Sequence, residues 1–343
     1  MFTRMRLIRV FAIVAVFTFA YAGCGKKTEE SHSNAPFKVG LVFDVGGRGD
    51  KSFNDAAYRG LERGKKELGV EYEYIEPGPG ADREAALRQL ATRDDISVIF
   101  GIGFIFTDDI TNISKEFPAK KFACVDYTYD STKPLPPNLL AIEFKEEEGS
   151  FLVGALAGLM TKTNILGFVG GMQSPLIKKF EAGYSQGVRY VNPNCTVLIG
   201  YAGNTGEAFK NPGKGKEIAL GQYSRGADII YHASGVTGLG VFEAAREMHK
   251  LAIGVDSDQN REAPGSVLTS MIKVVDTAIF ETIRQAKEAS FQGGRALTFD
   301  VKSKGVDYVY DENNKSLIPD DIHRKVEEIR NKINTGAIKV SYE

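Results

Sequence analysis

The chain has 343 residues, and its 43 Lys and Arg residues nearly balance its 44 Asp and Glu residues to give a net charge of −1. This balance creates no positive field that would attract nucleic acid, so we expect no nucleic-acid partner. The three cysteines occur singly, without the paired spacing of a disulfide framework or a zinc site.

The N-terminus has the features of a secretory signal peptide. Arginines precede an apolar run over residues 10–20, and the small residues Ala22 and Gly23 precede Cys24. This arrangement resembles a lipobox, in which Cys24 becomes the lipid-modified first residue, although Tyr21 stands where an aliphatic residue is usual. Plain cleavage and an uncleaved anchor are the alternatives. The apolar run is shorter than the roughly 20 residues that span a membrane.

We therefore expect a signal peptide over residues 1–23 and a lipidated tether over residues 24–36, which are small, polar and charged. These features predict a protein of the cell envelope, held to a membrane by lipid and facing the periplasm or the cell exterior. The remaining chain is long enough for two lobes of about 150 residues each.

After the tether, short apolar segments alternate with helical patterns almost without interruption. The predicted strands cover residues 38–43, 72–75, 97–101, 121–126, 139–144, 165–169, 196–201, 228–232, 251–255 and 267–272. They carry Val, Ile and Phe with little alternation, as strands buried on both faces do. Repeated strand-helix-strand units predict parallel sheets with helices on both faces, an α/β fold.

The apolar segment over residues 151–160 is predicted to be a buried helix of the core. It holds about 10 residues, too few for a membrane span. The preceding glutamates, Glu146, Glu147 and Glu148, suit the N-terminus of a helix because its dipole favours negative charge there. The first block of strands ends near this point, so we place the boundary between the two lobes at residues 142–143.

The stretch over residues 39–60 combines a strand end with groups that can bind a ligand. Asp44 can accept hydrogen bonds, three glycines at positions 46, 47 and 49 let backbone approach a ligand, and Phe53 offers a flat face to a ring. Ligands bind at the carboxyl ends of strands in open α/β sheets. The alternative is an ordinary loop in which Ser52 or Asn54 caps a helix and Phe53 packs into the core.

Three predicted strands end in an aspartate. Asp44, Asp126 and Asp256 follow the apolar segments VF, ACV and IGV, and the carboxyl ends of parallel strands lie along one edge of a sheet. Ionised carboxylates accept strong hydrogen bonds from hydroxyl groups such as those of a sugar. Each of these aspartates could instead cap a helix or occupy a solvated turn. For a fourth aspartate, Asp258, we prefer this purely structural interpretation.

No catalytic or metal-binding motif is complete. The segment GVDSDQNRE begins like a calcium loop, but Arg261 and Val267 occupy the positions of the turn glycine and the bidentate glutamate. The glycine-rich segments at residues 211–217 and 235–240 lack the order of phosphate-binding loops, and the four histidines are scattered. We expect no catalytic residues, no metal and no cofactor.

Four segments in order, DVGGRGDKSFN at 44–54, EAFKNPGKGKEIA at 207–219, GVDSDQ at 254–259 and LTSMIKVVD at 268–276, resemble the basic membrane protein (BMP) family. These are lipoproteins similar to the spirochaete purine nucleoside receptor and to nucleoside-binding subunits of ABC transporters. The resemblance spans nearly the whole mature chain. It implies a type I periplasmic-binding-protein fold, with two doubly wound parallel-sheet lobes joined by three hinge crossovers.

The resemblance also assigns the strand over residues 268–272 and the following helix over residues 274–289 to the first sheet. The N-terminal lobe would then comprise residues 37–142 plus about 270–298. The C-terminal lobe would comprise residues 143–269 plus about 299–343, including a charged helix over residues 319–335.

By matching position, the resemblance implies that Phe53 and Phe209 hold a base between opposite lobes. Asn54 and Asp126 would bond the edge of the base, and Asp44 would share this polar work.

The resemblance implies ribose contacts as well. Asp256 and Lys273 would hold the ribose hydroxyls, and Gly235 would let backbone approach the sugar. Lys273 could otherwise be a surface residue at a strand end. The turn HASG before Val236 departs from the family pattern, because relatives usually have more glycines there.

The resemblance implies a solute-binding lipoprotein, not an enzyme, that captures nucleosides, purine nucleosides above all, for an ABC transporter permease. Two alternatives remain. An extracytoplasmic nucleoside hydrolase would need a metal-binding acidic cluster, and a ligand-sensing surface lipoprotein would have no part in uptake.

Overall fold

The computed structural model describes residues 36–78 and 82–342, and residues Pro36–Glu343 form one compact unit. The predicted signal peptide, Cys24 and the tether up to residue 35 lie outside the described residues. Within the described part of the chain, no helix is both long and apolar enough to cross a membrane.

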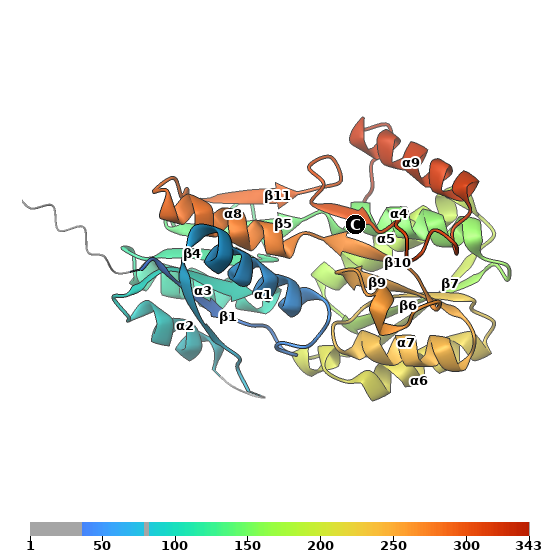
Figure 1. Ribbon diagram of the computed structural model, residues 1–343, viewed down its shortest axis with the longest axis horizontal. Coiled ribbons are helices and arrows are strands. Elements are labelled where there is room, and N and C mark those ends of the chain that lie inside the picture. Colours follow the sequence, from blue (N-terminus) through green and yellow to red (C-terminus); the bar gives the residue numbers. More distant parts are fainter. Residues whose placement is uncertain (1–35, 79–81, 343) are drawn as a thin grey trace, which may run out of the picture. The chain divides into compact units, whose positions relative to one another are not determined.

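The first sheet has six parallel strands in the order β11-β5-β4-β3-β1-β2 (Figure 1). Their bounds are β1 Lys38–Val42, β2 Glu71–Ile75, β3 Ile96–Ile102, β4 Lys121–Val125, β5 Leu139–Phe144 and β11 Arg295–Phe299. The five strands predicted for the first half of the chain are all confirmed.

The second sheet also has six strands, in the order β12-β10-β9-β8-β6-β7. Their bounds are β6 Ile165–Met172, β7 Thr196–Gly203, β8 Ile229–Ala233, β9 Leu251–Asp256, β10 Val267–Lys273 and β12 Val306–Tyr308. All neighbours are parallel except β12, which pairs with β10 in the antiparallel direction. The five strands predicted for this part of the chain are confirmed as well.

Both sheets share one winding order. In each lobe the second strand lies at the edge beside the first, and the third, fourth and fifth follow on the other side of the first. Strand order therefore reverses between β1 and β3 in the first sheet and between β6 and β8 in the second. Such switch points leave a crevice at the carboxyl ends of the strands, which makes this edge the expected place for a ligand.

Helices cover both faces of each sheet. Their bounds are α1 Phe53–Arg63, α2 Arg83–Ala91, α3 Thr107–Glu116, α4 Glu146–Met160, α5 Pro175–Val191, α6 Pro212–Ser224, α7 Thr237–Glu247, α8 Val275–Lys287 and α9 Asp320–Asn334. Buried clusters show α1 with α8 on one face of the first sheet and α2 with α3 on the other. In the second lobe, α4 with α5 and α6 with α7 cover opposite faces, and α9 packs on α4.

The chain passes between the sheets at three places: after β5, after β10 and after β11. The assignment of residues 268–272 to the first sheet is wrong, because β10 pairs with β9 and β12 of the second sheet. The chain returns to the first lobe only with α8, which packs against α1. Periodicity could not reveal this, since a buried strand has the same apolar pattern in either sheet. Strand β5 also continues to Phe144, beyond the expected boundary.

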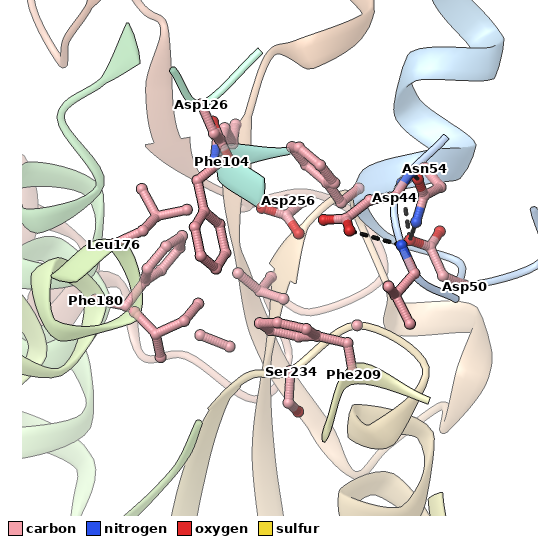
Figure 2. Close-up of a pocket in the computed structure, with 17 residues that line it drawn as sticks. Asp44, Asp50, Asn54, Phe104, Asp126, Leu176, Phe180, Phe209, Ser234 and Asp256 are labelled. Carbon is pink, nitrogen blue, oxygen red and sulfur yellow. Dashed lines mark hydrogen bonds and ion pairs between the residues drawn. The ribbon is translucent and has the colours of Figure 1, made fainter. Parts of the chain in front are cut away.

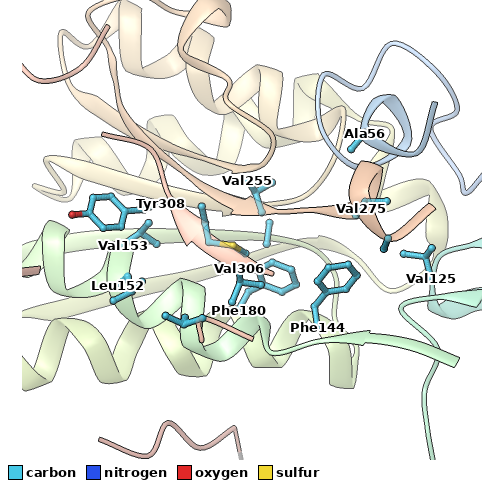
Figure 3. Close-up of a cluster of buried hydrophobic side chains, with 14 of the residues drawn as sticks. Ala56, Val125, Phe144, Leu152, Val153, Phe180, Val255, Val275, Val306 and Tyr308 are labelled. Atoms are coloured by element: carbon cyan, nitrogen blue, oxygen red, sulfur yellow. The ribbon is translucent and has the colours of Figure 1, made fainter. Parts of the chain in front are cut away.

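One buried hydrophobic cluster extends through both lobes along these crossings (Figure 3). It includes Val125 and Val275 on the side of the first sheet, Val255 and Val306 in the second sheet, and Phe144 at the first crossing. Apolar burial contributes roughly 25 cal/mol per Å². The crossings are therefore part of the core rather than exposed linkers.

Helices α4 and α5 approach each other closely through glycines. A Cβ atom on Gly154 would lie 2.2 Å from the carbonyl oxygen of Tyr184, and one on Gly187 would lie 2.1 Å from that of Phe151. Real Cβ atoms do not tolerate such contacts with backbone. The predicted buried helix over residues 151–160 is confirmed as part of α4, and its glycines are what allow this packing.

We predict that Gly187→Ala destabilises the protein by about 2 to 3 kcal/mol, because the added methyl group must push α4 away from α5. The matched control is Gly221→Ala, at an exposed position of α6 where an added Cβ meets nothing within 4 Å. That change should stabilise the protein by about 0.5 to 1 kcal/mol through helix propensity. Urea unfolding of residues 36–343 measures both, and equal effects of the two variants would contradict the packing argument.

Candidate functional site

A pocket lies where the carboxyl ends of the strands from both sheets meet (Figure 2). It encloses about 500 Å³ including its open mouth, a size typical of small-molecule sites. All eight candidate binding residues line it: Asp44, Phe53, Asn54, Asp126, Phe209, Gly235, Asp256 and Lys273. Residues separated by more than 200 positions in the sequence are thus brought into one site at the two switch points.

Two aromatic residues enter the pocket from opposite lobes. Phe53 is the first residue of α1, and Phe209 ends the short helix Gly206–Phe209 that follows β7. The Phe209 ring lies directly on Gly171 of β6, since a Cβ atom there would be 2.3 Å from the ring. Both phenylalanines are half-buried and also pack against the core cluster. The position of Phe53 is therefore compatible with stacking on a ligand and with packing into the core.

An apolar wall of the pocket was not predicted as part of the site. Phe104 follows β3, while Leu176 and Phe180 belong to α5, and the three side chains gather on one side of the pocket (Figure 2). In the sequence, Phe180 has the three- and four-residue spacing of a core helix, so periodicity gave no reason to separate it from core residues. Phe104 could have been noticed, because it is the third residue after the strand predicted over residues 97–101.

Asp50 also lines the pocket and was not predicted from the sequence. Its carboxylate accepts hydrogen bonds from the backbone N–H groups of Ser52, Asn54 and Asp55 at 2.9, 2.8 and 3.0 Å, and from Asn54 Nδ2 at 3.1 Å. These are the unpaired donors at the start of α1. In the alternative interpretation of this loop, the side chain of Ser52 or Asn54 caps the helix, but Ser52 at the N-cap position makes no side-chain capping bond. Asp50 caps it from outside and so fixes Phe53.

The three glycines of this loop do not line the pocket, contrary to the expectation that they let backbone approach a ligand. Gly46, Gly47 and Gly49 have φ values of 107°, 59° and 92°, a region that favours glycine. Their role is to turn the chain sharply from β1 into α1.

Asn54 joins the end of β1 to the start of α1. Its Oδ1 accepts a hydrogen bond from the backbone N–H of Asp44 at 3.1 Å, while Asp44 Oδ1 accepts one from the N–H of Val45 at 2.6 Å. Asp44 is buried, and loss of hydration raises the pKa of its carboxyl group to about 7. A neutral or partly protonated Asp44 can donate as well as accept a hydrogen bond.

A buried ammonium group forms the charged centre of the site. Lys273 Nζ lies 2.6 Å from Asp126 Oδ2 and 3.0 Å from Glu146 Oε1, and the Lys273 side chain is 1% exposed. Burial alone would lower the pKa of Lys273, but the facing carboxylates of Asp126, Glu146 and Asp256 raise it above its ordinary value. Lys273 is therefore charged at neutral pH, and it is not the surface residue of the alternative interpretation.

Asp126 has a buried oxygen available to a ligand. The residue follows β4 with a φ of 61°, and while its Oδ2 pairs with Lys273, its Oδ1 has no hydrogen-bond partner among the described residues. An unpaired buried acceptor costs roughly 1 to 3 kcal/mol. A ligand N–H or O–H group that reached Oδ1 would remove this cost.

Asp256, at the end of β9, links the two lobes directly. Its Oδ2 accepts a hydrogen bond from Ser52 Oγ at 2.6 Å, and burial raises the pKa of its carboxyl group. Beside it, Ser257 Oγ donates to the carbonyl oxygen of Ser52 at 3.0 Å and accepts from Arg59 Nη2 at 2.8 Å. Asp258 is exposed and accepts from the N–H of Asn260 at 3.0 Å, which confirms its assignment to a turn.

Gly235 follows β8 with a φ of 56°, close to the carbonyl oxygen of Phe209. Its neighbour Ser234 also lines the pocket and lies 3.3 Å from Nδ1 of the buried His232. Burial lowers the pKa of His232 to about 4, so its ring is neutral at pH 7 and serves to hold this strand end. Ser234 was not predicted, although it stands beside Gly235 in the same turn.

The pocket lining carries four carboxylates, from Asp44, Asp50, Asp126 and Asp256, and one ammonium group, from Lys273. In the described ranges of the chain, no three His, Cys, Asp or Glu side chains are placed to hold a metal ion. The arrangement suits a neutral ligand with a flat apolar part and several hydrogen-bond donors.

Comparison with known proteins gives consistent matches along the whole described unit. A family model described as "Bmp: ABC transporter substrate-binding protein PnrA-like" matches residues 37–343. The "CD4+ T-cell-stimulating antigen" of Listeria innocua is 38% identical over 336 residues, covering 92% of this chain and 91% of the relative. The "ABC transporter nucleoside-binding protein BmpA" of Lactococcus lactis is 33% identical over 328 residues, covering 89% of this chain and 91% of that protein.

Among solved structures, an ABC transporter system solute-binding protein from Aeropyrum pernix K1 has a TM-score of 0.82 and 27% sequence identity. The match covers 90% of this chain and 94% of that chain. This likeness, with the two doubly wound sheets, confirms the predicted periplasmic-binding-protein fold. The resemblance to basic membrane proteins is confirmed by the family match.

The raised pKa of Asp44 predicts a pH dependence of stability. Its carboxyl group has a pKa of about 7 when folded and about 3.8 in the unfolded chain. Between these values the folded state binds more protons, so this group's contribution makes the protein less stable as the pH rises from about 4 to 7. Asp44→Asn should flatten that slope by up to about 1.4 kcal/mol per pH unit.

Urea unfolding of the ligand-free protein at pH 5, 6, 7 and 8 measures this slope. Asn has the same shape and keeps an oxygen for the N–H of Val45, so the comparison isolates the carboxyl proton. An unchanged slope in Asp44→Asn would show that Asp44 does not titrate in this range.

Proposed function

The chain belongs to the Bmp family of ABC transporter substrate-binding proteins, and from this premise we propose that it captures nucleosides, purine nucleosides in particular. It holds them between its two lobes and delivers them to an ABC permease. The pocket carries this proposal, because it combines two phenylalanines from opposite lobes with buried carboxylates and one buried ammonium group. A nucleoside has the matching parts, a flat base and a polyhydroxylated sugar.

In this proposal the base lies between Phe53 and Phe209. Each stacking contact contributes about 1 kcal/mol beyond the area that it buries. Asp126 Oδ1, the buried acceptor without a partner, receives an N–H group from the edge of the base. Asn54 and Asp44 complete the polar contacts at the same edge, where they are already linked by a hydrogen bond.

The sugar lies toward the second lobe. Asp256 accepts hydrogen bonds from ribose hydroxyls and Lys273 donates to them, while the backbone at Gly235 approaches the sugar. The name of the Lactococcus lactis relative includes nucleoside binding, which supports this class of ligand.

Binding needs no covalent chemistry. Each lobe holds part of the ligand, so the ligand stabilises the arrangement in which the lobes are closed. The three crossings at β5, β10 and β11 act as the hinge. The lobes comprise residues 37–142 with about 274–298, and 143–273 with about 299–343, because β10 belongs to the second sheet.

The anchoring part of the proposal rests on the N-terminal sequence. Lipidation of Cys24 holds the protein at the membrane, outside the cytoplasm, and the polar segment up to residue 36 acts as a tether. A lipid anchor keeps the binding lobes close to the permease, so a released ligand meets the transporter at a high local concentration.

Calorimetric titration of residues 36–343 tests the ligand class. The panel comprises purine and pyrimidine nucleosides, their 5′-monophosphates, free bases and ribose. We expect purine nucleosides to bind most tightly, and monophosphates to bind at least about tenfold more weakly, because a phosphate would be buried among four carboxylates. No binding by any nucleoside would contradict the proposal, and release of free base from inosine would instead indicate a hydrolase.

Phe53→Ala should weaken nucleoside binding by about 1 to 3 kcal/mol through loss of base stacking. The matched control is Phe291→Ala, which removes another half-buried phenylalanine that packs on the same core cluster outside the pocket. The control should lose a similar amount of stability and no affinity, as measured by urea unfolding and calorimetry. If Phe53→Ala lowers stability while affinity stays intact, Phe53 belongs to the core only.

A further inference from the structure

Four buried or half-buried charges of alternating sign form a series of ion pairs that begins at the pocket lining and continues behind it. Asp126 pairs with Lys273 at 2.6 Å, Lys273 with Glu146 at 3.0 Å, and Glu146 with Lys179 at 3.4 Å. We propose that Glu146, supported by Lys179, is a positioning residue that sets the orientation of Lys273 and thereby the affinity for the sugar of the ligand. This inference rests on the proposed function of the pocket.

Glu146 does not touch the ligand space. It is absent from the lining of the pocket, and its side chain is 0% exposed. It is the first residue of α4, directly after the first crossing between the sheets. A buried carboxylate is expensive to desolvate and persists only when it is well paired. Here the two ammonium groups of Lys273 and Lys179 supply that pairing.

The neighbouring glutamates do not share this role. Glu148 pairs with Lys145 at 2.9 Å and accepts the backbone N–H of Val301 at 3.1 Å. Glu147 makes no ion pair within the described residues. All three glutamates sit in the first turn of α4, so an interaction with the helix dipole applies to each of them. Only Glu146 reaches Lys273, which separates its role from general stabilisation of the helix.

Lys273 needs a second partner because its side chain is long and flexible. Its ammonium group has three N–H donors that rotate together. One of them donates to Asp126 Oδ2. The carboxylate of Glu146, whose Oε1 lies 3.0 Å from Nζ, attracts the ammonium group electrostatically from a second side and so restricts its position. Phenylalanine rings confine the group further, with ring centroids 5.0 Å away at Phe53 and Phe144. Without Glu146 the ammonium group would pair with Asp126 alone and compete with the ligand for that carboxylate.

The series of ion pairs also connects the lobes at the hinge. Asp126 follows β4 of the first sheet, Lys273 ends β10 of the second sheet, and Lys179 lies in α5 of the second lobe. Glu146 and Lys273 stand at two of the three crossings. The position of Lys273 therefore depends on residues from both lobes, and Glu146 is the one that holds it from behind.

Calorimetry with Glu146→Gln in the full chain tests this role, with a purine nucleoside and its free base as probes. We expect affinity for the nucleoside to fall about tenfold and affinity for the free base to change less than about twofold, because Lys273 serves the sugar. In the Lys273→Met background, Glu146→Gln should cause no further loss of nucleoside affinity. The matched control Glu148→Gln, in the same turn of α4, should leave both affinities unchanged.

A second pair of variants covers the case in which Glu146→Gln does not fold. Lys179 is 20% exposed, and Lys179→Met should weaken nucleoside binding a few-fold while Lys179→Arg restores it. Equal losses for nucleoside and free base in Glu146→Gln or Lys179→Met would overturn the positioning role and indicate general destabilisation. Wild-type protein that binds no nucleoside would overturn the proposed function itself, and this inference with it.

Discussion

The site is organised around one buried cation. Lys273 is nearly inaccessible to solvent, yet it carries a charge that Asp126 and Glu146 compensate from either side. Because the desolvation of such a group is expensive, its partners cannot be rearranged freely. Asp126 comes from the first lobe and Lys273 from the second, so the ion pair ties together the two strand edges that form the pocket.

The winding of the sheets explains why a site can form there at all. Each sheet reverses its strand order once, beside its first strand, and leaves a crevice at the carboxyl ends. Two lobes with the same winding present two such crevices to each other. Short side chains at these ends, such as Asp44 and Asp256, then point at a shared space, while long aromatic residues close it from either side.

The sequence was sufficient for ten of the twelve strands in the described residues and for the strand-end aspartates, because both depend on local patterns. Apolar runs predicted ten strands, and aspartates directly after them predicted Asp44, Asp126 and Asp256 at one site. The sequence did not predict the residue roles and the strand pairing that depend on contacts between residues distant in the chain. Asp50 resembles any loop aspartate until its three backbone donors are seen, and Phe180 has the spacing of a core residue. The sheet that receives β10 could not be predicted for the same reason.

The direct bonds between the lobes set a requirement for ligand binding. Ser52 already donates to Asp256, and Ser257 with Arg59 adds two more hydrogen bonds across the same boundary. These three hydrogen bonds contribute to holding the lobes together, so the free energy of closure does not come from ligand contacts alone. The interlobe hydrogen bonds supply no partner for the buried Oδ1 atom of Asp126 or for the faces of Phe53 and Phe209. A nucleoside would supply those partners. The affinity for a ligand then depends on its contacts with this oxygen and these two rings. The same contacts select a ligand by its shape and charge.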